Sequence, residues 1–232
     1  MTKRTRPVVA IDGPVGAGKS TVARELAHAL NFEYLNTGAM YRAVAIAARD
    51  GGIDDNASGQ RLEQLLDSIA IKFDGEHVLL DGDDVTAKIS EPPVGDLASR
   101  LSTRPEVRAR LLKLQRAAGE MGGVVMEGRD IGTAIFPDAE FKFFLTASLE
   151  VRAARRFAEL AAHGVAITMQ EVSAQLRERD RRDLERALAP LRQADGAIVI
   201  DSSEIDVDKV VRTMQAHISP QSMRDAKDEP RP

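Results

Sequence analysis

The sequence predicts an α/β fold: a five-stranded parallel sheet with helices on both faces, and a small antiparallel β meander inserted into the chain. Short apolar runs rich in β-branched or aromatic residues alternate with longer stretches in which apolar residues recur three and four positions apart. This alternation is typical of a parallel sheet covered by helices. The exception is the stretch from Ile69 to Ser90, where Asp-Gly pairs separate short strands.

We expect the strands of the main sheet to be buried, because they are nearly continuous apolar runs. They are Val8 to Ile11, Phe32 to Leu35, Val124 to Met126, Phe141 to Leu145 and Ala197 to Ile200. The predicted helices are Lys19 to Leu30, Met40 to Ala48, Pro105 to Ala118, Leu149 to His163 and Met169 to Ala187. Thr168 and Glu171 fit a capping box, which favours a helix start at Met169.

The meander predicts a small sub-domain within one larger domain. A helix around Gln60 to Leu66 precedes it, and Glu91-Pro92-Pro93 follows it. We therefore expect one domain over residues 7–218, with an insertion at about 60–97. The basic segment 1–6 and the Pro-containing, charged segment 219–232 are expected to be disordered.

Composition excludes several classes of protein. The 232 residues are 43% hydrophobic and 29% charged, include no cysteine, and carry a net charge of −4. No run of about 18 apolar residues predicts a membrane helix, and the polar start lacks a signal-peptide pattern. A negative chain is not expected to bind nucleic acid generally, and a chain without cysteine has neither disulfides nor a thiol nucleophile. We therefore expect a cytoplasmic monomer with neither nucleic acid nor a membrane as partner.

Arginine outnumbers lysine by 24 to 8. This excess indicates bidentate recognition of phosphate or carboxylate groups. Genomic base composition alone produces the same excess, so composition leaves the two interpretations open.

The segment from Gly13 to Ser20 fits the phosphate-loop pattern G-x-x-x-x-G-K-[ST], between a predicted strand and a predicted helix. We expect Lys19 to reach the β- and γ-phosphates of ATP, and the Ser20 hydroxyl to ligate Mg²⁺. The strings D-x-x-G and N-K-x-D are absent, which disfavours a regulatory GTPase, and no strand ends in the paired acids of motor ATPases. Kinases of nucleotides or small molecules remain. The predicted ATP-binding residues of this segment are Gly13, Pro14, Val15, Gly16, Ala17, Gly18, Lys19, Ser20 and Thr21.

Further strings accompany the phosphate loop between about residues 8 and 200. They are Ile11 to Pro14, Asn36 to Arg42, Glu127 to Thr133, Phe136 to Ala139, Arg179 to Asp183 and Ala189 to Leu191. Together with the meander, they resemble the bacterial cytidylate kinases, a branch of the nucleoside monophosphate kinase group of P-loop kinases. The resemblance implies a (d)CMP kinase, which transfers the γ-phosphoryl group of MgATP to CMP and dCMP and forms CDP or dCDP and ADP. The alternative is a P-loop kinase of another nucleoside monophosphate or of a small alcohol.

The resemblance also implies roles for individual residues, and arginine forks suit them because they hold phosphate oxygens bidentately. The catalytic residues are expected to be Lys19, Arg129, Arg179 and Arg186. The CMP-binding residues are expected to be Thr37, Tyr41, Arg42, Ser99, Arg108, Arg129, Asp130, Arg179, Asp183 and Arg186. The resemblance places Ser99, Arg108 and Asp130 at the cytosine edge, with Asp183 on the sugar hydroxyls.

The resemblance also implies that the insertion at about 60–97 binds the acceptor, and that a helical lid over about residues 149–192 closes over the phosphates and excludes water. Arg179 and Arg186, seven apart, share one face if that helix is continuous. The alternative to a functional role is that both arginines lie on a solvated helix face and that Asp183 pairs with Arg179.

Two further assignments stay open on the donor side. The resemblance places Arg156 beside ATP, with Arg152 and Arg155 as further candidates, but all three fit an amphipathic helix surface equally well. Asp12 ends the first strand and is a candidate indirect partner of Mg²⁺ or Lys19.

Overall fold

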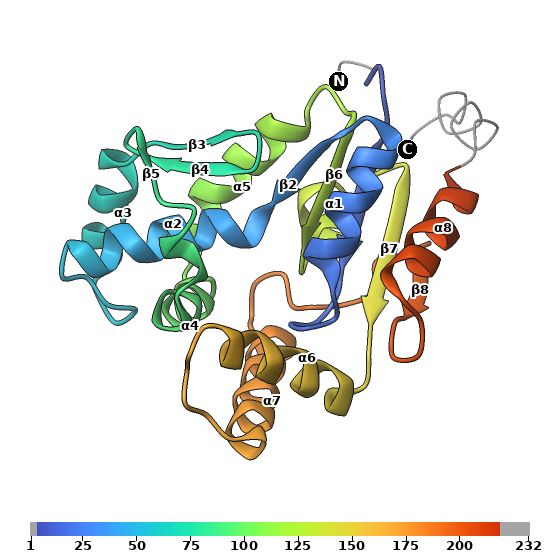
Figure 1. The fold of residues 1–232 in the computed structure, drawn as a ribbon. Coiled ribbons are helices and arrows are strands. Elements are labelled where there is room, and N and C mark those ends of the chain that lie inside the picture. The colour runs from blue at the N-terminus through green and yellow to red at the C-terminus, as the bar shows by residue number, and fades with distance from the viewer. Residues whose placement is uncertain (1–3, 219–232) are drawn as a thin grey trace. The chain divides into compact units, whose positions relative to one another are not determined.

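The structure is a computed structural model that describes residues 4–218 (Figure 1). The chain divides into two compact units, one formed by residues 1–33 with 121–232 and the other by Tyr34–Glu120. The tail predicted at 219–232 and residues 1–3 of the predicted N-terminal segment lie outside the described residues. Within the described part of the chain, no helix combines the length and apolarity that crossing a membrane requires.

The main sheet has five strands in the order β2-β6-β1-β7-β8. Their bounds are β1 (Val8–Asp12), β2 (Glu33–Asn36), β6 (Val124–Gly128), β7 (Phe141–Thr146) and β8 (Ile198–Asp201). β1 pairs in parallel with β6 and β7, and β7 pairs in parallel with β8. Every residue of β1 and β6 is buried, as continuous apolar strands at the centre of a parallel sheet require. The predicted α/β class and the five strands are confirmed.

The register brings the carboxyl ends of four strands to one edge of the sheet. Asp12 lies opposite Gly128 and Phe144, and Thr146 lies opposite Asp201. The segments that follow β1, β6, β7 and β8 therefore start from the same edge, where ligands bind in open parallel sheets.

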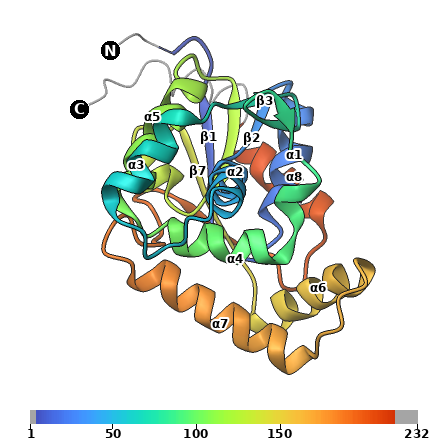
Figure 2. The same cartoon turned by 90° about the vertical axis from the view of Figure 1, so that its left-hand side faces the viewer.

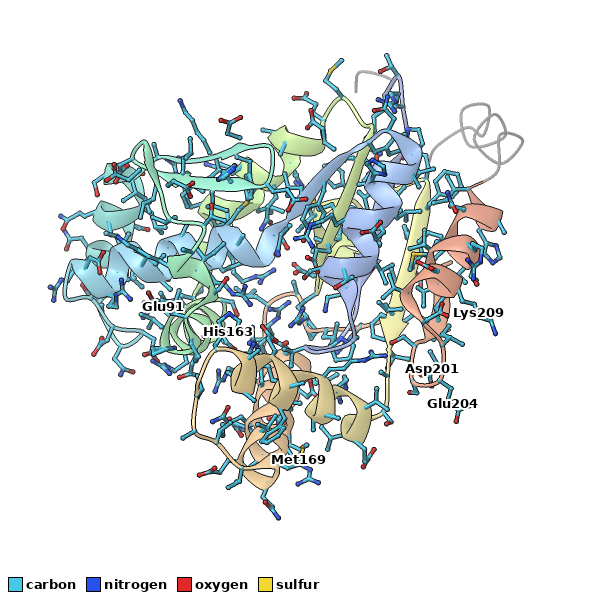
Figure 3. The ribbon with its side chains drawn as sticks, viewed as in Figure 1. Glu91, His163, Met169, Asp201, Glu204 and Lys209 are labelled. Carbon is cyan, nitrogen blue, oxygen red and sulfur yellow. The ribbon has the colours of Figure 1, made fainter. Side chains whose placement is uncertain are left out.

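The first unit also carries four α-helices and one π-helical turn within its described residues. These elements are α1 (Lys19–Leu30), η2 (Ile131–Ile135), α6 (Leu149–Ala162), α7 (Met169–Glu185) and α8 (Val207–His217). α1 packs against β1, β6 and α8, and α6 packs against α7 (Figures 1 and 2). Figure 3 labels His163 and Met169 on either side of the connection between α6 and α7.

Helix α7 differs from the prediction at one end. It starts at Met169 with the predicted capping box between Thr168 and Glu171. It ends at Glu185 and not at Ala187, because Arg186 leaves helical geometry with φ −58° and ψ 137°. The helix does not continue to Arg186, so the condition under which Arg179 and Arg186 would share one helical face is not met.

The second unit contains the meander and four α-helices. Its antiparallel strands follow the order β3-β4-β5, and a short 3-10 turn, η1, precedes α4. The bounds are β3 (Ile71–Asp74), β4 (His77–Leu80), β5 (Asp83–Asp84), α2 (Thr37–Asp50), α3 (Gly59–Ser68), η1 (Lys88–Ser90), α4 (Pro92–Leu101) and α5 (Pro105–Gly119). α2 packs against α4, α5 and β4. The predicted meander is confirmed, whereas the predicted boundaries of the insertion stay a prediction.

Helix α2 starts at Thr37, three residues before the predicted Met40. The Asn36 side chain accepts a hydrogen bond from Ala39 N and so caps the helix. Arg42 therefore lies inside α2.

The N-terminal residues that the structure describes make definite contacts. Arg4 forms ion pairs with Asp138 and Glu140, and Arg6 donates to Asn31 O at 2.6 Å. These contacts of Arg4 and Arg6 differ from the disorder expected over residues 1–6.

Candidate active site

The phosphate loop between β1 and α1 adopts a conformation that requires its glycines. Gly13, Gly16 and Gly18 have φ angles of 152°, 79° and 87°, which L side chains rarely adopt. A Cβ atom on Gly13 would lie 1.9 Å from the Leu145 carbonyl oxygen in β7. Helix α1 begins immediately after Gly18. The loop therefore leads into the positive end of a helix, which is the arrangement that binds phosphate.

Lys19 is held inside this loop. Its side chain is buried, and Nζ donates to Pro14 O at 2.8 Å. Burial lowers the pKa of Lys19 well below its ordinary value, and the positive charge of Arg129 lowers it further. An anion near these two groups would offset both effects, so Lys19 and Arg129 form a centre that favours phosphate.

Asp12 connects the phosphate-loop strand to the segment after β6. Its Oδ1 accepts from Ile131 N and its Oδ2 from Gly132 N, both at 2.8 Å. These bonds tie the end of β1 to the start of η2. Burial raises the pKa of Asp12 to about 6, with Asp130 adding to the rise. The hydrogen bonds of the carboxylate thus go to backbone N–H groups and not to Lys19.

Asp183 on α7 is the centre of an arginine cluster. It is 5% exposed, and its Oδ2 accepts from Arg129 Nε at 2.8 Å. Burial alone would raise the pKa of Asp183, but the charges of Arg129, Arg179 and Arg186 outweigh it and hold the pKa below its ordinary value. The carboxylate is therefore ionised at neutral pH and concentrates positive charge around itself.

Arg186 joins the same cluster from the turn that follows α7. Its Nε donates to Ala189 O at 2.7 Å, and its Nη2 lies 3.3 Å from Asp130 Oδ1. The side chain is only 4% exposed, so it does not belong to a solvated helix face. The structure thus brings together five of the predicted site residues, which are Arg129, Asp130, Arg179, Asp183 and Arg186.

The arginines of α6 differ in what they contact. Arg155 donates to both Oγ and O of Ser202, and Ser202 Oγ in turn donates to Ala17 O in the phosphate loop. Arg156, the residue predicted to lie beside ATP, forms an ion pair with Glu159 on its own helix. Ser202 was not among the predicted site residues, although its position directly after β8 at the carboxyl edge of the sheet was a usable signal.

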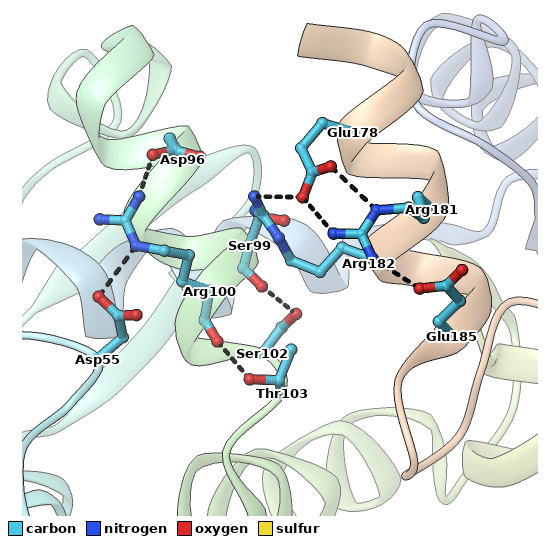
Figure 4. Close-up of polar contacts among 10 residues, drawn as sticks. All are labelled: Asp55, Asp96, Ser99, Arg100, Ser102, Thr103, Glu178, Arg181, Arg182 and Glu185. Atoms are coloured by element: carbon cyan, nitrogen blue, oxygen red, sulfur yellow. Dashed lines mark hydrogen bonds and ion pairs between the residues drawn. The ribbon is translucent and has the colours of Figure 1, made fainter.

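Other charged side chains of α7 form local surface pairs. Arg181 pairs with Glu178 and Glu185, and Arg182 approaches Glu178 at 3.8 Å (Figure 4). These pairs follow the three- and four-residue spacing of one helix face. Arg181 therefore lies on a solvated helix face, whereas the buried Arg186 does not.

The remaining predicted CMP-binding residues lie in the second unit. Arg108 on α5 donates from Nη1 to the Tyr41 hydroxyl at 3.3 Å and to Ser102 O at 3.4 Å. Ser102 Oγ donates to Ser99 O on α4 (Figure 4), and the Ser99 side chain is buried. Thr37 is the buried first residue of α2. Arg42 follows Tyr41 on α2, so α2, α4 and α5 carry the whole set.

The residues of the first unit fit Mg²⁺ that is held mainly by a nucleotide. Among residues 4–218, no three His, Cys, Asp or Glu side chains are grouped as a metal site would need. Ser20 lies exposed in the first turn of α1, next to Lys19. Mg²⁺ that keeps water and phosphate ligands needs few ligands from the protein, and the Ser20 hydroxyl meets that need.

Comparison with known proteins gives one consistent family. The family model for cytidylate kinase matches residues 9–220. The chain is 50% identical to a cytidylate kinase of Pelotomaculum thermopropionicum over 92% of this chain and 96% of that one. It is 48% identical to a cytidylate kinase of Citrifermentans bemidjiense over 91% and 92%.

A solved structure of an uncharacterized protein from Eubacterium ventriosum has a similar fold, with a TM-score of 0.51 at 15% identity. The match covers 92% of this chain and 98% of that one. At that identity the likeness concerns the fold alone. The family model spans the phosphate loop, the Asp183 cluster and the Arg108 contacts together, and the chain belongs to the cytidylate kinase family.

Proposed function

We propose that this chain transfers the γ-phosphoryl group of MgATP to CMP and dCMP, forming ADP and the pyrimidine nucleoside diphosphate. The observation that carries the proposal is the cluster of Arg129, Arg179 and Arg186 around Asp183, in the same unit as Lys19. Two phosphate groups repel each other, so a kinase must supply positive charge and alignment. As part of the proposal, the protein acts as a monomer in the cytoplasm.

In the proposed reaction, a phosphate oxygen of CMP attacks the γ-phosphorus of ATP. The bond from the γ-phosphorus to the oxygen that bridges the β- and γ-phosphates breaks, and that oxygen leaves with ADP. Lys19 neutralises charge on the β- and γ-phosphates, while Arg129, Arg179 and Arg186 hold the acceptor phosphate and the group in transfer. The Ser20 hydroxyl would hold Mg²⁺, which would neutralise further charge on the ATP phosphates.

The role of Asp183 is to order the arginines and to accept hydrogen bonds from the sugar of CMP. Its Oδ2 is engaged with Arg129 Nε, whereas Oδ1 is the oxygen that we assign to the sugar hydroxyls. The ionised carboxylate keeps the planar guanidinium of Arg129 in a fixed orientation, which a bidentate phosphate contact requires.

Arg108 is the residue that we assign to base selection, with Asp130 or Ser99 as the acceptor for the cytosine amino group. The contacts of Arg108 to Tyr41 and Ser102 hold its guanidinium in place. Cytosine has acceptors at N3 and O2, whereas uracil carries a donor at N3. A fixed donor therefore favours cytosine, because uracil would leave two donors facing each other.

The test is a panel of acceptors with MgATP and release of ADP as the readout. CMP and dCMP should be phosphorylated at much higher kcat/KM than UMP or AMP, and small alcohols such as shikimate should be inactive. Activity confined to AMP, UMP or an alcohol would contradict the proposal.

Arg108→Met tests base selection separately. We expect the ratio of kcat/KM for CMP over UMP to fall by about tenfold or more, because one positioned hydrogen bond is lost. Arg110→Met on the same helix is the matched control and should leave the ratio unchanged. An equal loss on both bases in Arg108→Met would refute the selective role.

A further inference from the structure

Arg152 on α6 makes polar contacts with three separate parts of the first unit. Its Nε donates to Ala147 O at 3.0 Å, and its Nη1 donates both to Val15 O at 3.2 Å and to Asp180 Oδ2 at 2.7 Å. The Arg152 side chain is 9% exposed. It therefore joins the end of β7, the phosphate loop and helix α7 through one buried group.

Asp180 on α7 relies on this contact. Its side chain is 18% exposed, and among the described residues its Oδ1 is buried without a hydrogen-bond partner. A carboxylate in that environment is stabilised by a charged partner, and here the partner is Arg152. Asp180 belongs to the string from Arg179 to Asp183, yet neither the phosphate contacts nor the sugar contacts proposed above make use of it.

Apolar packing reinforces the same connection. The side chain of Val15 in the phosphate loop packs against an apolar cluster between α6 and α7. The cluster comprises Ala153, Leu160, Val172 and Leu176. A Cβ atom on Gly16 would lie 3.1 Å from Arg152 Cβ, so the loop also passes close to α6. A displacement of α7 would therefore disturb both the backbone and a side chain of the phosphate loop.

We propose that Arg152 and Asp180 are positioning residues for phosphoryl transfer, which hold α7 at a fixed place relative to the phosphate loop. Arg179 and Asp183 lie one position before and three positions after Asp180, so the pair sets where they stand relative to Lys19. In-line transfer depends on that alignment, and a misplacement of about 1 Å costs on the order of 100-fold in rate. The inference rests on the proposed kinase function for its effect on rate.

The first test compares Asp180→Asn, Arg152→Met and the double variant, with Glu185→Gln and Arg181→Met as surface controls on α7. Each single variant should lower kcat for CDP formation by about 10- to 100-fold, with KM for ATP changed by less than about threefold. Unfolding midpoints should fall in the single variants, because each leaves a buried charge alone. The double variant carries neither charge, so its midpoint should return toward that of the wild type while its kcat stays low.

The different responses of kcat and of the unfolding midpoint in the double variant separate a positioning role from a role in stability. If kcat recovers together with the midpoint in the double variant, or if kcat is unchanged in both single variants, the positioning role is wrong. The surface controls should match the wild type in both kcat and midpoint.

The second test does not depend on catalysis. Addition of MgADP should slow hydrogen exchange of α7 amides in the wild type, because the occupied loop and α7 are linked through Arg152. In Asp180→Asn the protection should remain in the phosphate loop and be lost from α7. Protection of α7 that is equal in the wild type and the variant would overturn the proposal. Failure of the kinase function would instead appear as absence of CDP formation by the wild type, with the difference in exchange intact.

Discussion

Replacing Asp183 by Asn removes the charge that holds the arginine cluster together. The Asp183 and Arg129 side chains are 6% and 18% exposed, whereas those of Glu185 and Arg181 are 63% and 58% exposed. Breaking a buried pair from one side costs about 3–5 kcal/mol. We expect the lower end, about 3 kcal/mol, because Arg129 is partly exposed and the amide still offers one acceptor. For a chain of this length that corresponds to a midpoint lower by about 6–12 °C.

Thermal unfolding of Asp183→Asn and Glu185→Gln side by side measures this cost. Glu185→Gln removes a carboxylate from the same helix, and we expect no measurable change in its midpoint, because exposed pairs contribute little. The pKa of Asp183 lies below its ordinary value of 3.8. Its stabilising contribution is therefore present above that pH and lost as the pH falls through the folded-state pKa. Equal midpoints of the two variants at pH 7 would show that the buried charge of Asp183 does not stabilise the fold.

Three further substitutions test other parts of the site. Gly13→Ala should lower the unfolding free energy by about 3 kcal/mol, because the added Cβ meets Leu145 O. Gly75→Ala is the control: it has open space around it, so it should lower the unfolding free energy by only about 1 kcal/mol. Urea titration measures both changes. Asp12→Asn should remove a pH dependence. Because the folded-state pKa of Asp12 is about 6 against an ordinary 3.8, wild-type stability should fall relative to the variant as the pH rises between those values. Lys19→Met should abolish CDP formation while its unfolding midpoint at pH 7 does not fall, because the native state no longer buries an ammonium whose pKa is lowered.

Local patterns predicted most of the fold. The five strands were apparent as apolar runs, and the Asp-Gly pairs located the meander because its turns place Gly75 and Gly82 at positive φ. The early start of α2 follows from its cap by Asn36. Asparagine is a preferred residue at this position, so the sequence did contain a signal for the start. The end of α7 was not predictable in the same way. Arg186 leaves the helix and donates to Ala189 O and Asp130, and those contacts depend on the tertiary fold.

The candidate site also contains residues that the sequence predicts and residues that it does not. The phosphate loop was predicted because its motif is contiguous, and the arginines around Asp183 were predicted by resemblance. The contacts of Arg152, Asp180 and Ser202 join segments far apart in the chain. No spacing rule links such positions, so only the structure shows that they support the phosphate loop.

The most direct test of transfer from ATP to CMP follows the phosphoryl group itself. The protein is incubated with Mg²⁺, CMP and ATP labelled at the γ-phosphate, and the products are separated. We expect the label to appear in the β-phosphate of CDP, with one ADP formed for each CDP. Label recovered only as inorganic phosphate, or absent from every cytidine nucleotide, would contradict it.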